Sequence, residues 1–288
     1  MATRTLAALG LDVVPVQQPL TYPGPPVPGP SLLTGQVLLE LTAAAGPIGG
    51  WGVLPEGTGL DALLAASGQV VTGGRHPVLA VGSNAAPGQV AHKLSRMGLP
   101  LDVPMVPVQV QGVGIGCSGH ISPAGYVAAT PYAAQGLESR MVVAWLTPEQ
   151  LAAVDDTEFP DYRRALLTSA DFRMTLPSGE ELSAAYIYYS DHGLLLDPAG
   201  APRAGGGDQA ALLASLLADS AALRALLGPD PSDWVERARA DTTVREAGTR
   251  QFTAEGWVRP QDEFVPFAVT GGGGLFYDDL LAGAVPSA

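Results

Sequence analysis

The sequence predicts a fold that mixes strands and helices, and three stretches support this prediction. An apolar run at residues 78–81 stops at a Gly-Ser-Asn turn, and a helical pattern begins near Pro87. Residues 139–146 have the clearest strand pattern and also lead into a helix. Residues 164–176 and 181–189 have the pattern of two strands joined by a hairpin turn.

The length and composition indicate a folded protein with a large core. The chain has 288 residues, enough for one large domain or two smaller ones. Hydrophobic residues make up 47% of it and charged residues only 15%, which argues against global disorder. The 36 glycines and 26 prolines predict many turns and loops.

The charge balance narrows the expected partners. Asp and Glu total 28 against 15 Lys and Arg, so the net charge is -13. The chain lacks the basic footprint of a nucleic-acid-binding protein and is unsuited to anionic membranes. No apolar run has the length of a membrane span, and no signal peptide is recognisable, so we expect a cytoplasmic protein. A small molecule with a carboxylate is the expected partner, and the oligomeric state is left open.

The chain divides into three predicted parts. Residues 1–76 form a Pro- and Gly-rich extension. Its residues 1–36 are expected to be an extended arm over the body of the protein or a partly mobile tail, because prolines interrupt any helix and most strands there. Residues 77–190 contain the regular strands and helices of the core. Residues 191–288 are predicted to be mostly helical, with helices that begin near Asp208 and Ser232.

Two local patterns in the core predict opposite kinds of structure. Residues 105–113 alternate like a strand in which Pro107 requires an edge position or a bulge. The closely spaced glycines of residues 112–125 predict a loop-rich stretch.

After the 139–146 strand, Thr147 and Gln150 have the spacing of a capping box that starts a helix.

The turn Gly82-Ser83-Asn84 is the first candidate site. A strand, a tight turn and a helix in succession leave backbone N–H groups directed at one point near the positive end of a helix. Gly82 permits a close approach, while Ser83 and Asn84 add a hydroxyl and an amide. This arrangement predicts a binding site for a carboxylate or phosphate. The same tripeptide is also ordinary turn chemistry, so both interpretations stand.

Glu158 is the second candidate, at the predicted end of the 148–158 helix. Phe159 and Pro160 follow it and are expected to bury it in part, which would raise the pKa of a carboxyl group and suit it to act as a general base. The alternative is a solvated acidic corner of Asp155, Asp156 and Glu158 that pairs with Arg163 or Arg164.

The remaining nucleophiles and histidines give weaker signals. Cys117 and His120 lie close in the sequence, but a single Cys beside apolar residues is more often a small core residue. With one cysteine, the chain has no internal disulfide and no Cys-rich zinc site. His76, His92 and His192 share no spacing typical of metal ligands, so the sequence predicts no metal site.

Taken together, these motifs resemble the gamma-glutamylcyclotransferase-like superfamily. The resemblance covers roughly residues 77–190, a length typical of one domain. In chain order, the matching residues are Val81-Gly82-Ser83-Asn84, the acidic run Asp155 to Glu158, Tyr162-Arg163-Arg164, Gly179 in the hairpin turn, and Ala184-Ala185-Tyr186-Ile187-Tyr188.

The resemblance implies an α+β fold with a mixed, barrel-like sheet and flanking helices. In that family the Gly-Ser-Asn loop holds the carboxylate and amine of a gamma-glutamyl group, and a glutamate takes a proton from the amine. The amine then attacks the gamma-carbonyl, which gives 5-oxoproline and a released amine without any cofactor. Carried over to this chain, Glu158 would be the base, and the substrate-binding residues would be Val81, Gly82, Ser83, Asn84 and Tyr162.

The chain also departs from the family pattern. The family usually has Tyr before Gly-Ser-Asn and Leu after it, where this chain has Val81 and Ala85, so a hydroxyl and a ring are missing from the expected pocket wall. Two other functions therefore stay open. One is a non-catalytic member of the fold that binds a small anion or a protein, and the other is an unrelated hydrolase that uses Cys117 or Ser118 with a histidine.

Overall fold

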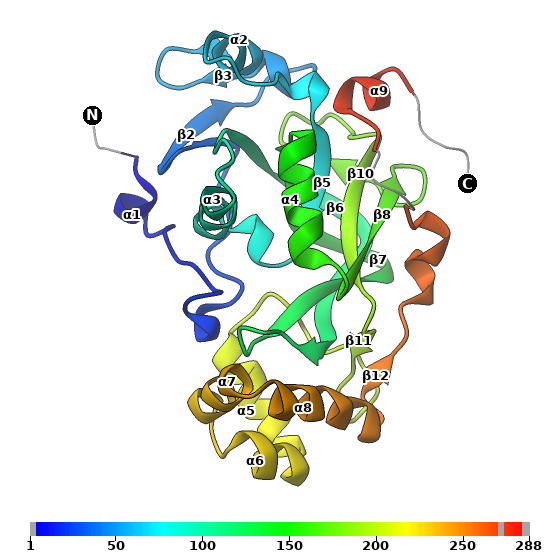
Figure 1. The fold of residues 1–288 in the computed structure, drawn as a ribbon. Coiled ribbons are helices and arrows are strands. Elements are labelled where there is room, and N and C mark those ends of the chain that lie inside the picture. The colour runs from blue at the N-terminus through cyan, green and yellow to red at the C-terminus, as the bar shows by residue number, and fades with distance from the viewer. Residues whose placement is uncertain (1–3, 270–273, 284–288) are drawn as a thin grey trace.

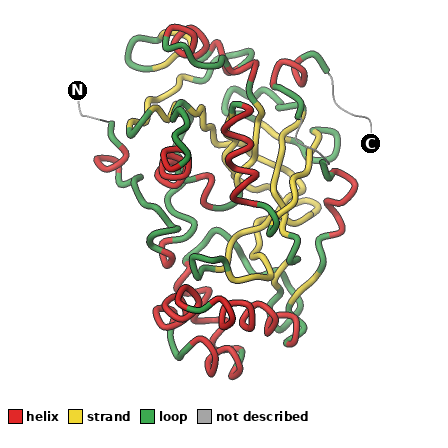
Figure 2. Tube along the Cα trace, in the orientation of Figure 1, coloured by secondary structure: helices red, strands yellow, loops and turns green. Residues whose placement is uncertain are grey.

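A large, mostly antiparallel sheet runs through the molecule, and helices pack around it (Figures 1 and 2). The computed structural model describes residues 4–269 and 274–283. The sheet follows the order β4-β3-β2-β1-β6-β7-β5-β10-β8, with β9 and β11 also paired to β6, and β12 paired to β11. The fold is therefore α+β, as expected, and the sheet does not close into a barrel.

The strands differ greatly in length. In chain order they are β1 (Ser31–Thr34), β2 (Val37–Thr42), β3 (Gly52–Val53), β4 (Thr58–Gly59), β5 (His76–Ala80), β6 (Val103–Ile121), β7 (Val127–Leu146), β8 (Tyr162–Thr168), β9 (Met174–Thr175), β10 (Ala184–Ser190), β11 (Leu194–Leu195) and β12 (Val258–Arg259).

The helices fall into a group beside the sheet and a group at one end of it (Figure 1). They are α1 (Leu6–Leu9), α2 (Leu60–Ala66), α3 (Pro87–Arg96), α4 (Pro148–Glu158), α5 (Gln209–Asp219), α6 (Ala221–Leu227), α7 (Pro231–Ala240), α8 (Thr242–Ala254) and α9 (Tyr277–Leu281). Short 3-10 turns are η1 (Pro19–Thr21), η2 (Ile48–Gly50), η3 (Thr72–Gly74), η4 (Ser83–Ala85) and η5 (Asp262–Phe267).

The hairpin of β6 and β7 is the longest pairing in the sheet, and it corrects one prediction. Residues 112–125 were expected to form a loop-rich stretch, but β6 continues as a strand to Ile121. Its glycines are where other groups pack closely, since a Cβ at Gly114 would collide with Tyr132 and one at Gly116 would lie 2.5 Å from Leu194. Glycine therefore marks close packing here and not a loop.

Pro107 lies inside β6 without disrupting the sheet. On one side of β6 it is opposite Val142 of β7. On the other side β1 pairs with residues 103–105 and β9 pairs with residues 109–110, so Pro107 falls in the gap between two short partners. A proline has no N–H to donate to a strand, and the gap requires none.

The helices that border the site form as predicted. After β5, the turn η4 leads into α3, which begins at Pro87. In α4 the capping box is present, because the Thr147 side chain accepts from the Gln150 N–H and the Gln150 side chain accepts from the Thr147 N–H. These caps fix where α4 starts and, by its length, where it ends at Glu158.

Both faces of the sheet are covered by apolar side chains, and β10 shows this most clearly. Tyr186 and Tyr188 of β10 belong to the core cluster that includes α3 and α4 residues, whereas Ile187 and Tyr189 belong to a second cluster that includes α2 residues. Successive side chains of a strand point to opposite faces, so this alternation places one core on each face. Every residue of β10 is buried, as expected for a strand whose sequence is apolar on both faces.

The two extensions take part in the same sheet as the central region. From the N-terminal extension, β1 pairs with β6, and from the C-terminal extension β11 pairs with β6. The helices α5 to α8 form a third core that packs on the tip of the β6–β7 hairpin through Ile121 and Val127. The predicted division at residues 76 and 190 stays a prediction, and the strands of all three parts are hydrogen-bonded to one another.

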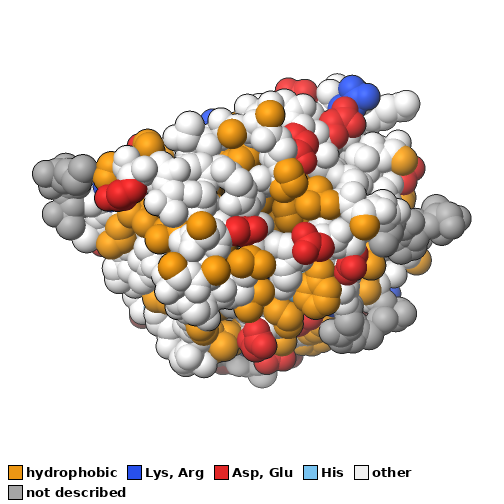
Figure 3. Space-filling view, turned by 90° about the horizontal axis from the view of Figure 1, so that it is seen from above, with side chains coloured by type: hydrophobic (Ala, Val, Ile, Leu, Met, Phe, Trp, Pro, Cys, Tyr) orange, Lys and Arg blue, Asp and Glu red, His pale blue; other side chains and the backbone are white. Residues whose placement is uncertain are grey.

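The face that carries α2 and α9 bears acidic side chains scattered among apolar and polar ones, with few basic ones (Figure 3). Within the part of the chain that the structure describes, no single helix has the length and apolar character of a membrane span. The helices α5 and α6 are together long and apolar enough for a membrane span, but the chain bends by 119° between them. The sequence has a glycine run at residues 271–274, of which only Gly274 lies within the described residues.

The N-terminal arm packs directly against the first turn of α3, and this contact can be tested at Gly88. In an open helix, Gly→Ala stabilises by up to about 1 kcal/mol. Here a Cβ at Gly88 would lie 2.6 Å from the carbonyl oxygens of Leu11 and Val13, which are backbone atoms of the arm. We therefore expect Gly88→Ala to lower the free energy of unfolding in urea by about 1–3 kcal/mol. Ser95→Ala on the exposed face of the same helix is the control, and an unchanged or raised stability in Gly88→Ala would contradict the packing.

Candidate active site

A cavity of ≈ 510 Å³ lies between the Gly-Ser-Asn turn, α3, the end of α4 and the tip of the β6–β7 hairpin. The predicted site residues Val81, Gly82, Ser83, Asn84, Glu158 and Tyr162 all line it. Residues more than 70 positions apart in the sequence thus meet around one space. Whether they bind a substrate or catalyse a reaction stays a prediction.

Glu158 projects into this cavity from the last turn of α4 and is bound on one oxygen. Its Oε1 accepts hydrogen bonds from Asn84 Nδ2 at 3.0 Å and from Lys93 Nζ at 3.2 Å. The Lys93 ammonium also donates to Asn84 Oδ1 at 2.9 Å, so the three side chains form a closed triangle. Among the described residues, Oε2 of Glu158 accepts no hydrogen bond, which leaves it available to a ligand.

The acidic run that precedes Glu158 is split between different partners. Asp155 pairs with Arg164 at 2.6 Å, whereas Arg163 pairs with Asp191 at 2.6 Å. Glu158 pairs with Lys93 instead, so of the acidic corner expected as the alternative only the pair of Asp155 and Arg164 forms. Phe159 was expected to help bury Glu158, but it is largely exposed. The burial of the Glu158 side chain, 17% exposed, comes from the walls of the cavity.

The backbone of the Gly-Ser-Asn turn has free donors beside this triangle. The carbonyls of Gly82 and Ser83 accept from the N–H groups of Ala85 and Ala86, which closes η4. Among the described residues, the N–H groups of Gly82, Ser83 and Asn84 donate to no acceptor. Backbone N–H groups that line a cavity in this way can bind an anionic group of a ligand.

The N-terminal arm supplies a wall that the sequence analysis did not anticipate. Tyr22, from the arm, lines the cavity and stacks on Tyr126 with ring centroids 4.3 Å apart. A Cβ at Gly82 would collide with the Tyr22 hydroxyl, so a glycine is needed there. Tyr22, from a remote segment, thus places a ring and a hydroxyl beside the turn.

The tyrosines around the cavity are neutral and two of them are held by the backbone. The Tyr22 hydroxyl accepts from Ala129 N–H at 2.7 Å, and the Tyr162 hydroxyl donates to the Ala129 carbonyl at 3.1 Å. Burial raises the pKa of Tyr22 and of Tyr162 well above the ordinary value, and that of Tyr126 to about 12. These phenols can offer or accept hydrogen bonds at neutral pH without bearing charge.

Two histidines that seem unrelated in the sequence meet at the edge of the cavity. His120 and His192 stack with ring centroids 4.5 Å apart, and His192 Nε2 lies 2.8 Å from Asp161 Oδ1. Burial lowers the pKa of His120 to about 4, and the nearby His192 acts in the same direction. The hydrogen bond with His192 lowers the pKa of Asp161. This cluster was not predicted, because the spacing of His76, His92 and His192 in the sequence is not that of metal ligands.

The unrelated-hydrolase alternative requires a nucleophile beside a histidine in a cavity, and the structure provides only the contact with the histidine. Ser118 Oγ lies 2.5 Å from His120 Nδ1, within hydrogen-bond distance for a serine and a base. However, the Ser118 side chain is fully buried, does not line the cavity, and is also bonded to Ser190 Oγ at 2.7 Å. A nucleophile must reach its substrate, so Ser118 is a structural partner of His120 in this conformation.

Lys93 is a cavity residue that was not predicted, although its position in the sequence could have indicated it. It lies four positions after Gln89 on α3, so both polar side chains share one face of a helix that begins beside the candidate turn. That face points into the cavity, whereas Val90 and Leu94 enter the core. Tyr22 and Tyr126 had no such signal, because only the fold brings the arm and the hairpin tip to the turn.

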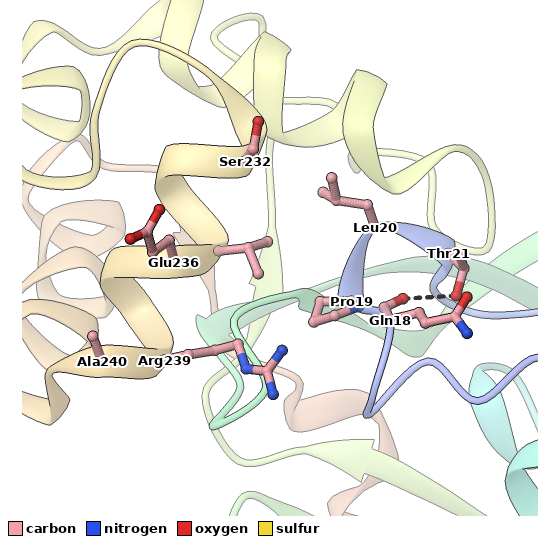
Figure 4. A pocket seen from close by; sticks show the side chains of 9 residues that line it. Gln18, Pro19, Leu20, Thr21, Ser232, Glu236, Arg239 and Ala240 are labelled. Atoms are coloured by element: carbon pink, nitrogen blue, oxygen red, sulfur yellow. Dashed lines mark hydrogen bonds between the residues drawn. The ribbon is translucent and has the colours of Figure 1, made fainter.

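A second cavity, of ≈ 610 Å³, lies between the N-terminal arm and α7 (Figure 4). Leu20 of the arm faces the helix there, and the Arg239 side chain extends from α7 toward Pro19. Its walls are predominantly apolar, and the triangle of Asn84, Lys93 and Glu158 takes no part in it. Polar side chains such as Glu236 and Arg239 line this cavity too, but none of the predicted site residues does.

Comparisons with known proteins give only distant structural similarities. No family model matches the chain, and no curated protein matches it. Among solved structures, one titled "Gamma-glutamyl cyclotransferase" is 14% identical, covers 41% of this chain and 67% of its own, and has a TM-score of 0.33. An uncharacterised protein from Homo sapiens is 16% identical, with coverages of 41% and 67% and a TM-score of 0.32. A protein from Arabidopsis thaliana solved in solution is 17% identical, with coverages of 44% and 74% and a TM-score of 0.33.

The first of these titles names the family that the sequence resembles, and the matched share is consistent with the central region. At these TM-scores and identities the similarities carry no argument about function.

Cys117 offers a test of the buried face of β6. Burial raises the pKa of its thiol to about 12, and its Sγ donates to the Ala204 carbonyl at 3.3 Å. The thiolate is the reactive form, so at pH 8 the thiol of the folded protein is almost entirely protonated and unreactive. We expect the folded protein to react far more slowly with a thiol-specific disulfide reagent than the protein in urea, as followed by absorbance. Equal rates in the two states would show that Cys117 is accessible and reopen the nucleophile interpretation.

Proposed function

We propose that this protein is a gamma-glutamylcyclotransferase-like enzyme that acts on a gamma-glutamyl amine or amide and releases 5-oxoproline, with Glu158 as the general base. The observation that carries the proposal is that Glu158 and the Gly82–Asn84 turn line one cavity, with the Glu158 carboxylate 3.0 Å from the Asn84 amide. A carboxylate for proton transfer and donors for an anion are the two groups that the reaction needs.

The donors around the turn support binding of the alpha-carboxylate of a gamma-glutamyl group. The N–H groups of residues 82–84 have no acceptor among the described residues, and the Ser83 hydroxyl lines the same cavity. The ammonium of Lys93, whose side chain is 10% exposed, adds a positive charge next to Asn84. A carboxylate bound there would exchange its hydration for several charge-assisted hydrogen bonds.

The proton transfers follow from the position of Glu158. With Oε1 held by Asn84 and Lys93, the free Oε2 takes a proton from the alpha-ammonium of the substrate. The resulting amine attacks the gamma-carbonyl carbon, a five-membered ring forms, and the bond to the leaving amine breaks. Glu158 returns its proton to the leaving amine, and the second proton passes there from the ring nitrogen through solvent. Because amine and carbonyl belong to one molecule, the main task of the protein is to hold the substrate folded.

Replacing the base tests the proposal directly. We expect Glu158→Gln, which keeps the size of the side chain and removes its basicity, to lower kcat for 5-oxoproline release about 10²- to 10⁴-fold. The assay measures 5-oxoproline from a panel that contains glutathione, gamma-glutamyl amino acids and gamma-glutamyl amines. The matched control is Asp156→Asn, because Asp156 is an exposed acid on the same helix that does not line the cavity. Equal rates in wild type and Glu158→Gln would remove Glu158 from the reaction.

A non-catalytic, anion-binding role is the second candidate. Turnover distinguishes the two candidates, and Lys93 tests the anion binding that both of them require. The buried ammonium of Lys93 favours an anionic ligand whether or not Glu158 is a base. We expect wild type to bind 5-oxoproline or glutamate in calorimetry and Lys93→Met to bind at least about tenfold more weakly, since a charged hydrogen bond is lost. Binding without any turnover across the panel would support the second candidate. Binding that is equal in Lys93→Met would contradict both.

A further inference from the structure

We propose that His120, Asp161 and His192 form a binding site for one divalent transition-metal ion of the zinc type. The site lies at the edge of the main cavity, which is the one lined by Glu158 and the Gly82–Asn84 turn. His120 and Asp161 both line that cavity, so the coordination position left open by three protein ligands would face a substrate or water. The site stands whether or not Glu158 is a base, and it adds a second chemical group to the same space.

The distances suit a small ion. One imidazole or carboxylate atom from each of the three residues can be chosen so that all lie within 4.8 Å of one another. Asp161 Oδ1 lies 2.8 Å from His192 Nε2, and Asp161 Oδ2 lies 3.9 Å from His120 Nε2. Ligand atoms on a tetrahedral ion with bonds of about 2.1 Å lie about 3.4 Å apart. The two distances, one to each oxygen of Asp161, lie on either side of this value, so the side chains must rotate to ligate one ion.

The ligand set also matches the chemistry of such ions. Two imidazole nitrogens and one carboxylate oxygen form the protein part of many catalytic zinc sites and of non-haem iron sites. Two neutral imidazoles and one carboxylate give the site a single negative charge toward a dication. Mg²⁺ and Ca²⁺ prefer oxygen ligands, so we expect them to bind poorly here.

A chain of buried serines orients His120 in the way that metal-bound histidines require. Ser118 Oγ lies 2.5 Å from His120 Nδ1 and 2.7 Å from Ser190 Oγ, and Ser190 Oγ accepts from the His192 N–H at 3.0 Å. With Nδ1–H donating to Ser118 and Ser118 donating to Ser190, the donors run in one direction. Nε2 of His120 then keeps its lone pair toward Asp161, which is the outer-shell arrangement that supports metal ligation.

The backbone brings the three ligands together from different elements. His120 belongs to β6, Asp161 immediately precedes β8, and His192 follows β10. The Asp191 N–H donates to the Asp161 carbonyl, and the Gly119 N–H donates to the Gly193 carbonyl, both at 2.9 Å. A Cβ at Gly119 would collide with the His192 carbonyl, so a glycine beside His120 is what allows this close approach.

The test is metal binding by the untagged full-length protein after dialysis against a chelator. We expect Co²⁺ to give visible absorption bands of low-coordinate cobalt that saturate at one ion per chain, and Zn²⁺ to displace it. Zn²⁺ should also raise Tm of the wild type, because a ligand that binds only the folded state stabilises it. Mg²⁺ in the same titrations should do neither. Absence of cobalt bands and of any Zn²⁺ effect on Tm overturns the proposal.

Variants then assign the ligands. We expect His192→Gln and Asp161→Asn, both at partly exposed positions, to weaken Co²⁺ binding on the order of 100-fold or more, and Ser118→Ala to weaken it by about 10- to 100-fold. The matched control is His92→Gln, because His92 lines the same cavity from α3 but lies outside the cluster. Circular dichroism verifies that each variant is folded. Undiminished Co²⁺ binding in folded His192→Gln and Asp161→Asn would place the ion elsewhere and refute the assignment.

Discussion

The pairing of β6 with β7 is the constraint on which the rest of the structure depends. These strands, of 19 and 20 residues, form one hairpin that holds β1, β9 and β11 on one side and β5 on the other. Its tip carries Tyr126 into the main cavity and presents Ile121 and Val127 to the C-terminal helices. A shift of this pairing by one residue would exchange the two faces and disrupt both cores at once.

The main cavity exists because four separate segments converge on this hairpin. The arm contributes Tyr22, the turn after β5 contributes Asn84, α3 contributes Lys93 and the end of α4 contributes Glu158. None of these segments encloses a space by itself. The charged pair of Lys93 and Glu158 is largely removed from solvent, where electrostatic interactions are stronger than at the surface. A buried pair is costly when one partner is lost, so the two side chains and Asn84 act as a unit.

The sequence predicts local structure and short-range caps well, because their causes are local. The start of α3 at Pro87 and the capping box at Thr147 follow from residues within a few positions of one another. The closely spaced glycines around Cys117 were misjudged for a non-local reason. They accommodate Tyr132, Leu194 and the His192 carbonyl, which approach from other parts of the chain. Glycine has the same local signature in a loop and at a close contact.

In the candidate site, too, only the residues with a local signal in the sequence could be predicted. The turn and Glu158 were found because each ends or begins a predictable element, whereas the Tyr22 wall and the histidine cluster depend on the tertiary arrangement. His120 and His192 are 72 positions apart and meet only because β11 pairs with β6 and brings the chain after β10 beside it. No spacing rule applies to ligands brought together in this way.

The segment from Glu158 to Asp161 links the two chemical groups of the cavity. Glu158 is the last residue of α4, and Asp161 lies three positions later, immediately before β8. The helix end is held by the Lys93 and Asn84 contacts, and the start of β8 is held by the Asp191–Asp161 backbone hydrogen bond. Because both ends of so short a segment are fixed, the two carboxylates cannot move far relative to each other. A ligand that contacts Glu158 would therefore lie at a defined distance from Asp161 and His120, and the geometry of that ligand is restricted by both groups.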